Sequence, residues 1–375
     1  MSSIIESKAP GKILWLGGYA ILEKPNIGLV TTTDNAYVTA RITLLDNNEV
    51  HLSAQDLDEK YDGSINLTTG KIIPNAPQRL NLLKTSCEIA SMYALSKGKN
   101  IKGLRISTKN DKQFAYALDS GKLSKSGLGA SAAVTVAVVK GILTAYGMDP
   151  MENEAAHKLS QLAHSVATGK VGSGFDIAAA TYGSIVYERY SPGILKDFPK
   201  EYSYNDIKKI TEQHWDYKIE PLSLPRNFKV LMANFINDAA ITISLVSKVN
   251  EFKAKNYDEY SKLITKINEQ DELAIRYLRK LSKGSIDPED LAKFKAAFDS
   301  ARLVTKELGA SAGIDIEDSE ATKLIEDCKR NGALVARLPG AGGRDSIAAI
   351  AIGDKAYSKL KKFLSSKNKL KLLEV

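Results

Sequence analysis

The stretch that decides the fold runs from Lys125 to Ala133 and reads Lys-Ser-Gly-Leu-Gly-Ala-Ser-Ala-Ala, followed at once by the apolar run 134–139. This pattern predicts a loop of small residues that leads into a buried helix. Gly127 and Gly129 allow a tight turn and let a ligand approach the backbone closely. The first amide hydrogens of a helix have no partner inside the helix, and the helix dipole adds partial positive charge there. A phosphate group therefore fits this loop, although a plain glycine turn before a packed helix is an equally simple interpretation.

This loop is the first candidate site of the chain. Its serine and alanine side chains are small enough to leave the amide hydrogens uncovered. The pattern is not that of a Walker loop, because neither glycine is followed by the Gly-Lys-Ser/Thr that ends such a loop. The residues expected to contact a nucleotide are Ser126, Gly127, Leu128, Gly129, Ala130 and Ser131.

The composition is that of an ordinary globular protein with an excess of positive charge. The chain has 375 residues, enough for two lobes around one cleft. Lys and Arg outnumber Asp and Glu by 52 to 44, and this excess favours anionic ligands. No basic run is interleaved with aromatic residues, so we expect no nucleic-acid partner. The lysine-rich stretch 355–371 carries apolar residues at helical intervals, which predicts an amphipathic helix with a solvated face.

The numbers and spacing of cysteine and histidine residues indicate which cell compartment and which metal sites to expect. Cys87 and Cys328 are too few for a disulfide framework and show no metal-binding spacing, which predicts a reduced, cytoplasmic protein. The first residues contain charges and no apolar core, so we expect no signal peptide. No apolar run of roughly 18 residues occurs, so we expect no membrane partner. Four histidines without a close pair indicate neither a zinc site nor a serine-hydrolase site.

Strand-like and helix-like stretches alternate through both halves of the chain. The first strand, 4–16, is expected to break at Ala9-Pro10-Gly11. The polar, proline-containing stretch 191–225 is the best candidate for a join between two lobes. Further strands are expected over 29–45, 101–108, 229–234, 333–338 and 346–352, a hairpin region over 50–73, and helices over 80–95, after the loop to about 147, over 150–168, between 241 and 308, and over 319–330.

Lys12 sits in the first expected strand, among Ile, Leu and Trp residues. Lysine is almost never fully buried without a partner, so we expect its ammonium group to point into a cleft that holds an anion. An edge-strand lysine in water is the alternative. The same strand leads into a second glycine motif, Gly17-Gly18-Tyr19, which continues to Glu23.

A third motif, Gly172-Ser173-Gly174-Phe175-Asp176, precedes a stretch of small apolar residues. A carboxylate buried there without a partner would be costly, so Asp176 is expected to meet a cation, a metal or a substrate proton. The alternative is that Asp176 is the N-cap of a helix starting at Ile177. Lys170, six residues before Asp176, is expected to offer charge to a phosphate.

The fourth motif, residues 339–346, reads Pro-Gly-Ala-Gly-Gly-Arg-Asp-Ser and lies between two expected strands. Its three glycines favour close approach of the backbone to a ligand or to another loop, and a structural hairpin is the alternative. Arg344 is a planar donor suited to a phosphate.

The four motifs together resemble those of the GHMP kinase superfamily, the small-molecule kinases that include galactokinase, homoserine kinase and mevalonate kinase. The matching segments are 9–12, 127–133, 172–176 and 340–343, in the family's order and across nearly the whole chain. Within the superfamily, the sequences of the segments around Tyr19 and Asp176 are most similar to those of phosphomevalonate kinases.

The resemblance implies a two-lobe α/β (α+β) fold, with an ATP-binding lobe over residues 1–200 and a lobe of sheet and helices over 201–375. It implies that Lys12 lies near the transferred phosphoryl group, that Asp176 lies at the acceptor, and that Ser131 contacts magnesium or phosphate. The side chains expected to bind the acceptor are Tyr19, Lys170, Ser173 and Arg344. Mevalonate kinases carry a magnesium-binding glutamate eleven residues before the aspartate, and that position is Ser165 here.

The function that the resemblance implies is ATP-dependent phosphorylation of mevalonate 5-phosphate to mevalonate 5-diphosphate, a step of isoprenoid biosynthesis, with Mg²⁺ as cofactor. The expected assembly is a monomer or a homodimer. One alternative is mevalonate kinase or another GHMP kinase with an alcohol acceptor. A second alternative is a catalytically inactive nucleotide-binding regulator, since fold does not fix function.

Overall fold

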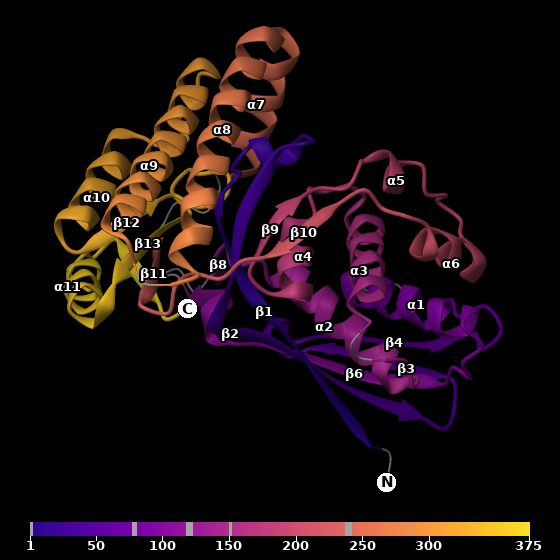
Figure 1. Cartoon of the computed structure of the whole chain (residues 1–375). Coiled ribbons are helices and arrows are strands. Elements are labelled where there is room, and N and C mark those ends of the chain that lie inside the picture. The colour runs from indigo at the N-terminus through magenta and orange to yellow at the C-terminus, as the bar shows by residue number, and fades with distance from the viewer. Residues whose placement is uncertain (1–2, 77–80, 118–122, 150–151, 237–241, 285) are drawn as a thin grey trace.

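The computed structural model of the chain describes residues 3–76, 81–117, 123–149, 152–236, 242–284 and 286–375. These residues form two lobes, each built on its own β-sheet and covered by helices (Figure 1). The predicted mixed α/β fold is thereby confirmed. The starts predicted for helices at 150 and 241 lie outside the described residues.

The first lobe is built on a mainly antiparallel sheet. In the described part of the chain its strands follow the order β10-β9-β2-β6-β3-β4-β5, and β1 runs along the other edge of β2. The strands are β1 (Ile4–Leu16), β2 (Ile27–Leu45), β3 (Glu49–Ala54), β4 (Glu59–Ile65), β5 (Ile72–Pro74), β6 (Gly103–Asn110), β9 (Ile185–Glu188) and β10 (Lys218–Pro221). A short separate ribbon pairs β7 (Ala115–Ala117) with β8 (Leu123–Lys125), directly before the glycine loop.

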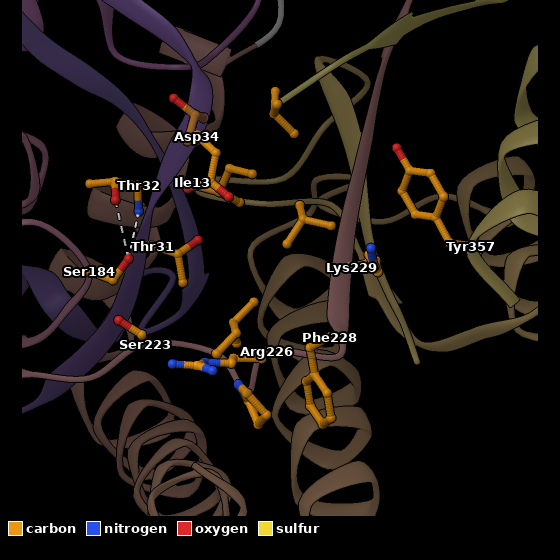
Figure 2. Close-up of a pocket in the computed structure, with 15 residues that line it drawn as sticks. Ile13, Thr31, Thr32, Asp34, Ser184, Ser223, Arg226, Phe228, Lys229 and Tyr357 are labelled. Atoms are coloured by element: carbon orange, nitrogen blue, oxygen red, sulfur yellow. Dashed lines mark hydrogen bonds between the residues drawn. The ribbon is translucent and has the colours of Figure 1, made fainter. Parts of the chain in front are cut away.

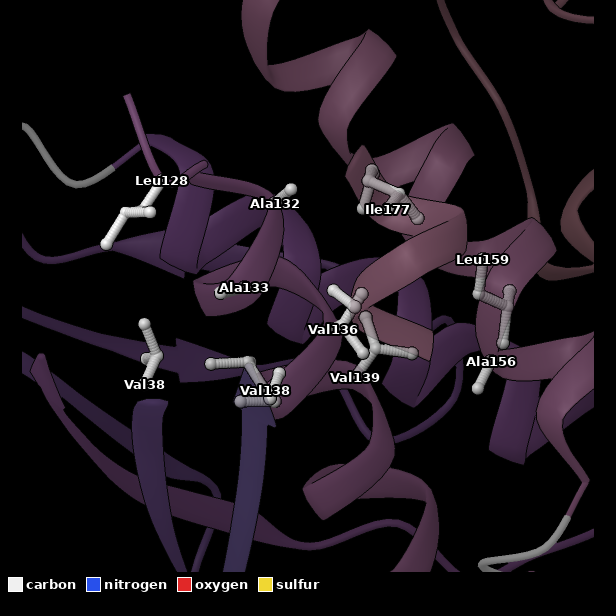
Figure 3. Close-up of a cluster of buried hydrophobic side chains, with 14 of the residues drawn as sticks. Val38, Leu128, Ala132, Ala133, Val136, Val138, Val139, Ala156, Leu159 and Ile177 are labelled. Atoms are coloured by element: carbon white, nitrogen blue, oxygen red, sulfur yellow. The ribbon is translucent and has the colours of Figure 1, made fainter. Parts of the chain in front are cut away.

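Helices pack against this sheet around α2, the helix that the glycine loop starts. The helices are α1 (Asn81–Ser96), α2 (Ala130–Ala145), α3 (Asn153–Thr168), α4 (Phe175–Tyr182), α5 (Gly193–Lys196) and α6 (Tyr204–Glu212). Figure 3 shows Val138 of α2 beside Val38 of the sheet, and Val136 and Val139 turned toward Leu159 of α3. Because buried apolar side chains cover most of α2, the helix is held firmly against its neighbours.

The second lobe has a four-stranded sheet in the order β12-β13-β11-β14, again counted over the described residues. Its elements are β11 (Phe228–Phe235), α7 (Thr242–Lys255), α8 (Tyr257–Leu281), α9 (Pro288–Ser311), α10 (Ser319–Arg330), β12 (Ala333–Arg337), β13 (Ser346–Ile352), α11 (Gly353–Ser365) and β14 (Leu370–Leu373). The predicted lysine-rich amphipathic helix is α11, which buries Leu360 and Leu364. Across the residues that can be described, no helix is both long and apolar enough to cross a membrane.

Two predictions about the first lobe are correct only in part. β1 continues as one strand through Ala9-Pro10-Gly11, but its register against β2 shifts between Pro10 and Lys12, where the proline has no N–H to donate. The stretch 191–225, predicted to join the lobes, leads from β9 of the first sheet toward β11 of the second, but most of it packs on the first lobe. It contains α6, which buries Ile207 and Ile210, and β10, which pairs with β9. The first sheet therefore extends beyond residue 200, and the division into lobes at that residue stays a prediction.

The lobes meet at the end of β1 that carries Lys12. Trp15 of β1 packs against Phe298 of α9 with their ring centres 6.4 Å apart. Tyr19, in the turn after β1, is buried in an apolar cluster with side chains of α7, α8 and α9. Because β1 contributes to both interfaces, Lys12 lies close to the boundary between the lobes.

Candidate active site

Lys12 is bound to the glycine loop through both its backbone and its side chain. The Lys12 N–H donates to the Leu128 carbonyl over 2.9 Å, and Lys12 Nζ donates to the Gly127 carbonyl over 2.8 Å. The same ammonium group lies 5.4 Å from the ring centre of Phe175, at the start of α4. Lys12 therefore joins three of the four sequence motifs at one point.

The glycine loop has the geometry that its sequence predicts. Gly127 and Gly129 both adopt positive φ, and Gly129 is the N-cap of α2 without a side-chain cap. A Cβ on Gly129 would lie 3.0 Å from Cε of Lys12, so a side chain there would press on the lysine. The loop is thus shaped by contact with Lys12 as well as by the turn.

The two serines of the loop differ in their surroundings. Ser126 is buried, and its Oγ has no hydrogen-bond partner among the described residues. Ser131 is exposed on the first turn of α2, and its Oγ lies 3.4 Å from Nε2 of His164 on α3. His164 was missed by the sequence analysis, because only the packing of α3 against α2 brings it to the loop.

Asp176 lies on the first turn of α4, whose N-cap is Gly174 rather than the aspartate. Its Oδ1 accepts a hydrogen bond from the Ile177 N–H over 2.9 Å. Burial lowers the pKa of Lys12, and the negative charge of Asp176 opposes that effect. Lys12 is thus a cation whose charge acts on Asp176, although the two side chains form no direct ion pair, and a metal or a substrate proton beside Asp176 stays a prediction.

The loop before α4 is held in place through its backbone. The Gly172 carbonyl accepts from Nη2 of Arg189 over 2.9 Å, and the Ser173 carbonyl accepts from the Tyr187 hydroxyl over 3.1 Å. Arg189 also donates through Nη1 to the Leu22 carbonyl over 2.7 Å, so it links this loop to the turn after β1. Sequence reasoning missed Arg189, since nothing local marks an arginine at the end of a strand as a link between two loops.

Lys170 is exposed and lines a cavity of about 630 Å³ next to that loop. Ser165, where the resemblance places a glutamate, lines the same cavity from α3. The α3 side chain beside Ser131 is therefore His164, not Ser165.

Tyr19 and Arg344 use their polar groups inside the protein. The buried Tyr19 hydroxyl donates to the Ala341 carbonyl over 2.8 Å. Arg344 forms ion pairs of 2.6 Å with Asp318 and 2.7 Å with Glu320. Both residues thus fix the loop 339–346, and a direct contact of either with the acceptor stays a prediction.

The loop 339–346 completes the convergence of the four motifs. The Gly340 N–H donates to the Leu14 carbonyl over 3.3 Å, close to Lys12 on β1. Its last residue, Ser346, places Oγ 3.9 Å from where a Cβ on Gly127 would lie. All four motifs therefore surround the end of β1, although they are spread from residue 9 to residue 346.

Metal ligands are sparse at this point. The described part of the chain holds no group of three or more His, Cys, Asp or Glu side chains that could bind a metal ion. Mg²⁺ in nucleotide sites takes most of its ligands from phosphates and water and only one or two from the protein. The exposed hydroxyl of Ser131 fits such a limited role.

A second cavity, of about 570 Å³, lies between the lobes and is lined by Ile13, the residue after Lys12. Figure 2 shows Thr31, Thr32 and Asp34 on the side of the first lobe and Lys229 and Tyr357 on the side of the second. No residue predicted for the site lines this cavity. This cavity lies beside the end of β1 where the four motifs meet, but none of the four motifs lines it.

The chain is similar in sequence to known proteins. The chain matches the GHMP kinases N terminal domain over residues 85–184 and the GHMP kinases C terminal domain over residues 291–367. A phosphomevalonate kinase of Saccharolobus solfataricus is 30% identical, with 92% of this chain and 90% of the relative covered. A phosphomevalonate kinase of Candida albicans is 27% identical, with 92% of this chain and 88% of the relative covered.

The fold is also similar to that of solved structures. The Streptococcus pneumoniae phosphomevalonate kinase in complex with phosphomevalonate and AMPPNP superimposes with a TM-score of 0.75, 20% identity and 98% of both chains covered. This chain belongs to the GHMP kinase family, and it is an ATP-binding kinase by that membership.

Proposed function

We propose that the protein transfers the γ-phosphoryl group of ATP to the phosphate of mevalonate 5-phosphate, giving mevalonate 5-diphosphate. The observation that carries the proposal is the position of Lys12, between the glycine loop of α2 and the first turn of α4, which carries Phe175 and Asp176. The choice of acceptor is supported by relatives named phosphomevalonate kinase that match over 92% of this chain.

Phosphoryl transfer asks mainly for positioning and for neutralisation of charge. The free amides at the start of α2 would bind the β- and γ-phosphates. Lys12 Nζ, which donates to the Gly127 carbonyl, would turn its remaining N–H groups to the oxygens of the transferred group. Mg²⁺ bound with ATP would supply further neutralisation, with Ser131 as its ligand from the protein.

The acceptor determines what Asp176 has to do. A phosphate monoester has a second pKa of about 6, so its oxygen is already ionised at neutral pH. Asp176 is then not needed as a general base and would orient Lys12 through opposite charge. Lys170, which has no ion pair among the described residues, would help to bind the 5-phosphate.

The test is a coupled ADP-release assay run in parallel with mevalonate 5-phosphate, mevalonate, galactose and homoserine. We expect mevalonate 5-phosphate to have the highest kcat/KM. A preference for mevalonate would instead support the alternative that the protein is a mevalonate kinase, which phosphorylates an alcohol. ATP binding without turnover of any acceptor would support the inactive regulator.

A further inference from the structure

A buried carboxylate lies where the two lobes meet, at the turn that follows Lys12 and its strand. Asp271 of α8 is fully buried. Its Oδ2 accepts a hydrogen bond from the Gly17 N–H over 2.9 Å, whereas its Oδ1 has no hydrogen-bond partner in the described part of the chain. A buried carboxylate with one neutral hydrogen bond is costly to the fold. Packing alone therefore does not account for Asp271.

The charge of Arg337, the last residue of β12, acts on Asp271 through the interior, although the two side chains form no direct ion pair, and Nε and Nη1 of Arg337 have no hydrogen-bond partner in the described part of the chain. Arg337 is 3% exposed, and its guanidinium carbon lies 5.5 Å from the ring centre of Phe298. Burial raises the pKa of Asp271 to about 7, and the charge of Arg337 and the Gly17 N–H oppose the rise. The other charges that act on the pair are Glu272 on Asp271, and Glu317 and Arg302 on Arg337.

Each member of this pair is attached to a different loop of the candidate site. Gly17 begins the turn after β1, and its φ of +108° and a Cβ position 2.9 Å from the Gly28 Cα leave room only for glycine. Arg337 lies two residues before the start of the loop 339–346. The two loops also bind each other, because the Tyr19 hydroxyl donates to the Ala341 carbonyl.

A second side chain of α8 holds the same connection. Asn268 lies one helical turn before Asp271, and its Oδ1 accepts from the Ile27 N–H over 3.0 Å. Gly17 and Ile27 are the two ends of the link between β1 and β2. One face of α8 therefore fixes both ends of the segment that follows Lys12.

We propose that Asp271 is a positioning residue of the kinase reaction. Through its bond to Gly17 and its charge opposite Arg337, it holds the turn after β1 and the loop 339–346 in the arrangement that presents Lys12 to the reacting groups. Asp271 acts through these loops and does not touch substrate. The acceptor used in its test rests on the proposed function.

The Asp271→Asn variant keeps the volume and an oxygen for the Gly17 N–H but removes the charge. We expect kcat/KM for mevalonate 5-phosphate to fall on the order of 10- to 100-fold, because small displacements of a phosphoryl-transfer site cost that much. Arg337→Met should cause a similar fall. The double variant should recover most of the loss, since it removes both buried charges and leaves neither without its opposite.

The matched control is Leu278→Ala. Leu278 is fully buried on the same helix, so this variant should lower the melting temperature without lowering kcat/KM in the temperature range where it stays folded. Hydrogen exchange gives a readout that needs no acceptor. Residues 14–28 and 338–346 should exchange faster in both single charge variants, near the wild-type rate in the double variant, and unchanged in Leu278→Ala.

Wild-type kinetics and exchange in Asp271→Asn would overturn the proposal. A double variant that only adds the two losses would overturn it as well, and this variant remains informative if the single variants do not fold. If the wild-type protein does not use mevalonate 5-phosphate, the proposed function fails, while the exchange pattern still decides the positioning role.

Discussion

At the scale of single residues, Lys12 and Gly129 shape each other. The lysine stem lies across the glycine, at the distance where a Cβ would make an unusually close contact. The ammonium group at its end is held by the Gly127 carbonyl and lies near Asp176. A glycine at position 129 is therefore required by the lysine as well as by its left-handed backbone.

Replacing Lys12 tests the charge directly. Lys12→Met keeps the length of the side chain, and we expect kcat to fall about 10²-fold, or roughly 3 kcal/mol of transition-state stabilisation. Lys8→Met is the control, because Lys8 is exposed on the same strand and pairs with Glu6. Equal kcat values for the two variants in the ADP-release assay would remove Lys12 from the chemistry.

Replacing Gly129 separates backbone strain from contact. Gly129→Ala and Gly98→Ala both force alanine into positive φ, which costs roughly 1 kcal/mol of stability in each case, but a Cβ on Gly98 meets no atom within 4 Å. Only Gly129→Ala should also raise the KM for ATP. Unfolding curves and ATP saturation of the two variants measure this. A normal KM in Gly129→Ala would place the phosphates away from the loop.

At the scale of elements, the loop 169–174 owes its shape to distant partners. Its carbonyl groups are bound by Arg189 and Tyr187 at β9, which leaves the side chains of Lys170 and Ser173 free to face solvent or a ligand. Side chains in such a loop can be substituted without changing the course of its backbone. Mutations there should therefore affect binding more than folding.

Lys170→Met tests whether this loop binds the acceptor. A charge-assisted contact contributes roughly 1.5–3 kcal/mol, so the KM for mevalonate 5-phosphate should rise about 10- to 150-fold, with the KM for ATP changed far less. Lys209→Met, at an exposed lysine of α6, should change neither KM. An unaltered acceptor KM in Lys170→Met would show that the 5-phosphate is bound elsewhere.

At the scale of the whole molecule, the helices of the second lobe hold the turn that follows Lys12. Lys253 of α7 and Tyr260 of α8 both bind Glu23 Oε1, at 2.7 and 2.5 Å. The turn that follows Lys12 is therefore held in part by the second lobe, so we expect unfolding of that lobe to disturb the site.

His157 should make the stability of the protein depend on acid pH. It is fully buried between Tyr182 and Tyr217, and burial lowers its pKa to about 3. The unfolded chain, with an ordinary histidine pKa near 6.5, then binds a proton that the folded protein rejects. The contribution of His157 to stability is therefore complete above about pH 6.5 and falls below it, by about 2 kcal/mol between pH 7 and pH 5, while the raised pKa of Asp271 acts in the opposite direction over the same range.

Urea unfolding at pH 5, 6 and 7 measures this loss. His157→Gln should gain about 2 kcal/mol relative to the wild-type protein between pH 7 and pH 5, while His214→Gln, at an exposed histidine, should leave the wild-type dependence unchanged. A wild-type slope in His157→Gln would show that other groups cause the acid sensitivity.

The sequence by itself determined the local structure and the motifs. Glycines with small neighbours predicted the loop before α2, and the capping and periodicity of residues 319–330 predicted α10 with its observed bounds. Such features depend on φ/ψ preferences and on spacing along one helix or strand, which are properties of neighbouring residues.

Only the tertiary structure decided which side chains meet. It brought Lys12 to Gly127 and Asp176, placed His164 rather than Ser165 beside Ser131, and gave Tyr19 and Arg344 partners inside the protein. It also showed that 191–225 packs on the first lobe, because the apolar face of α6 is buried by α1. These contacts join residues far apart in the chain, and no local preference encodes which distant surface will cover a given side chain.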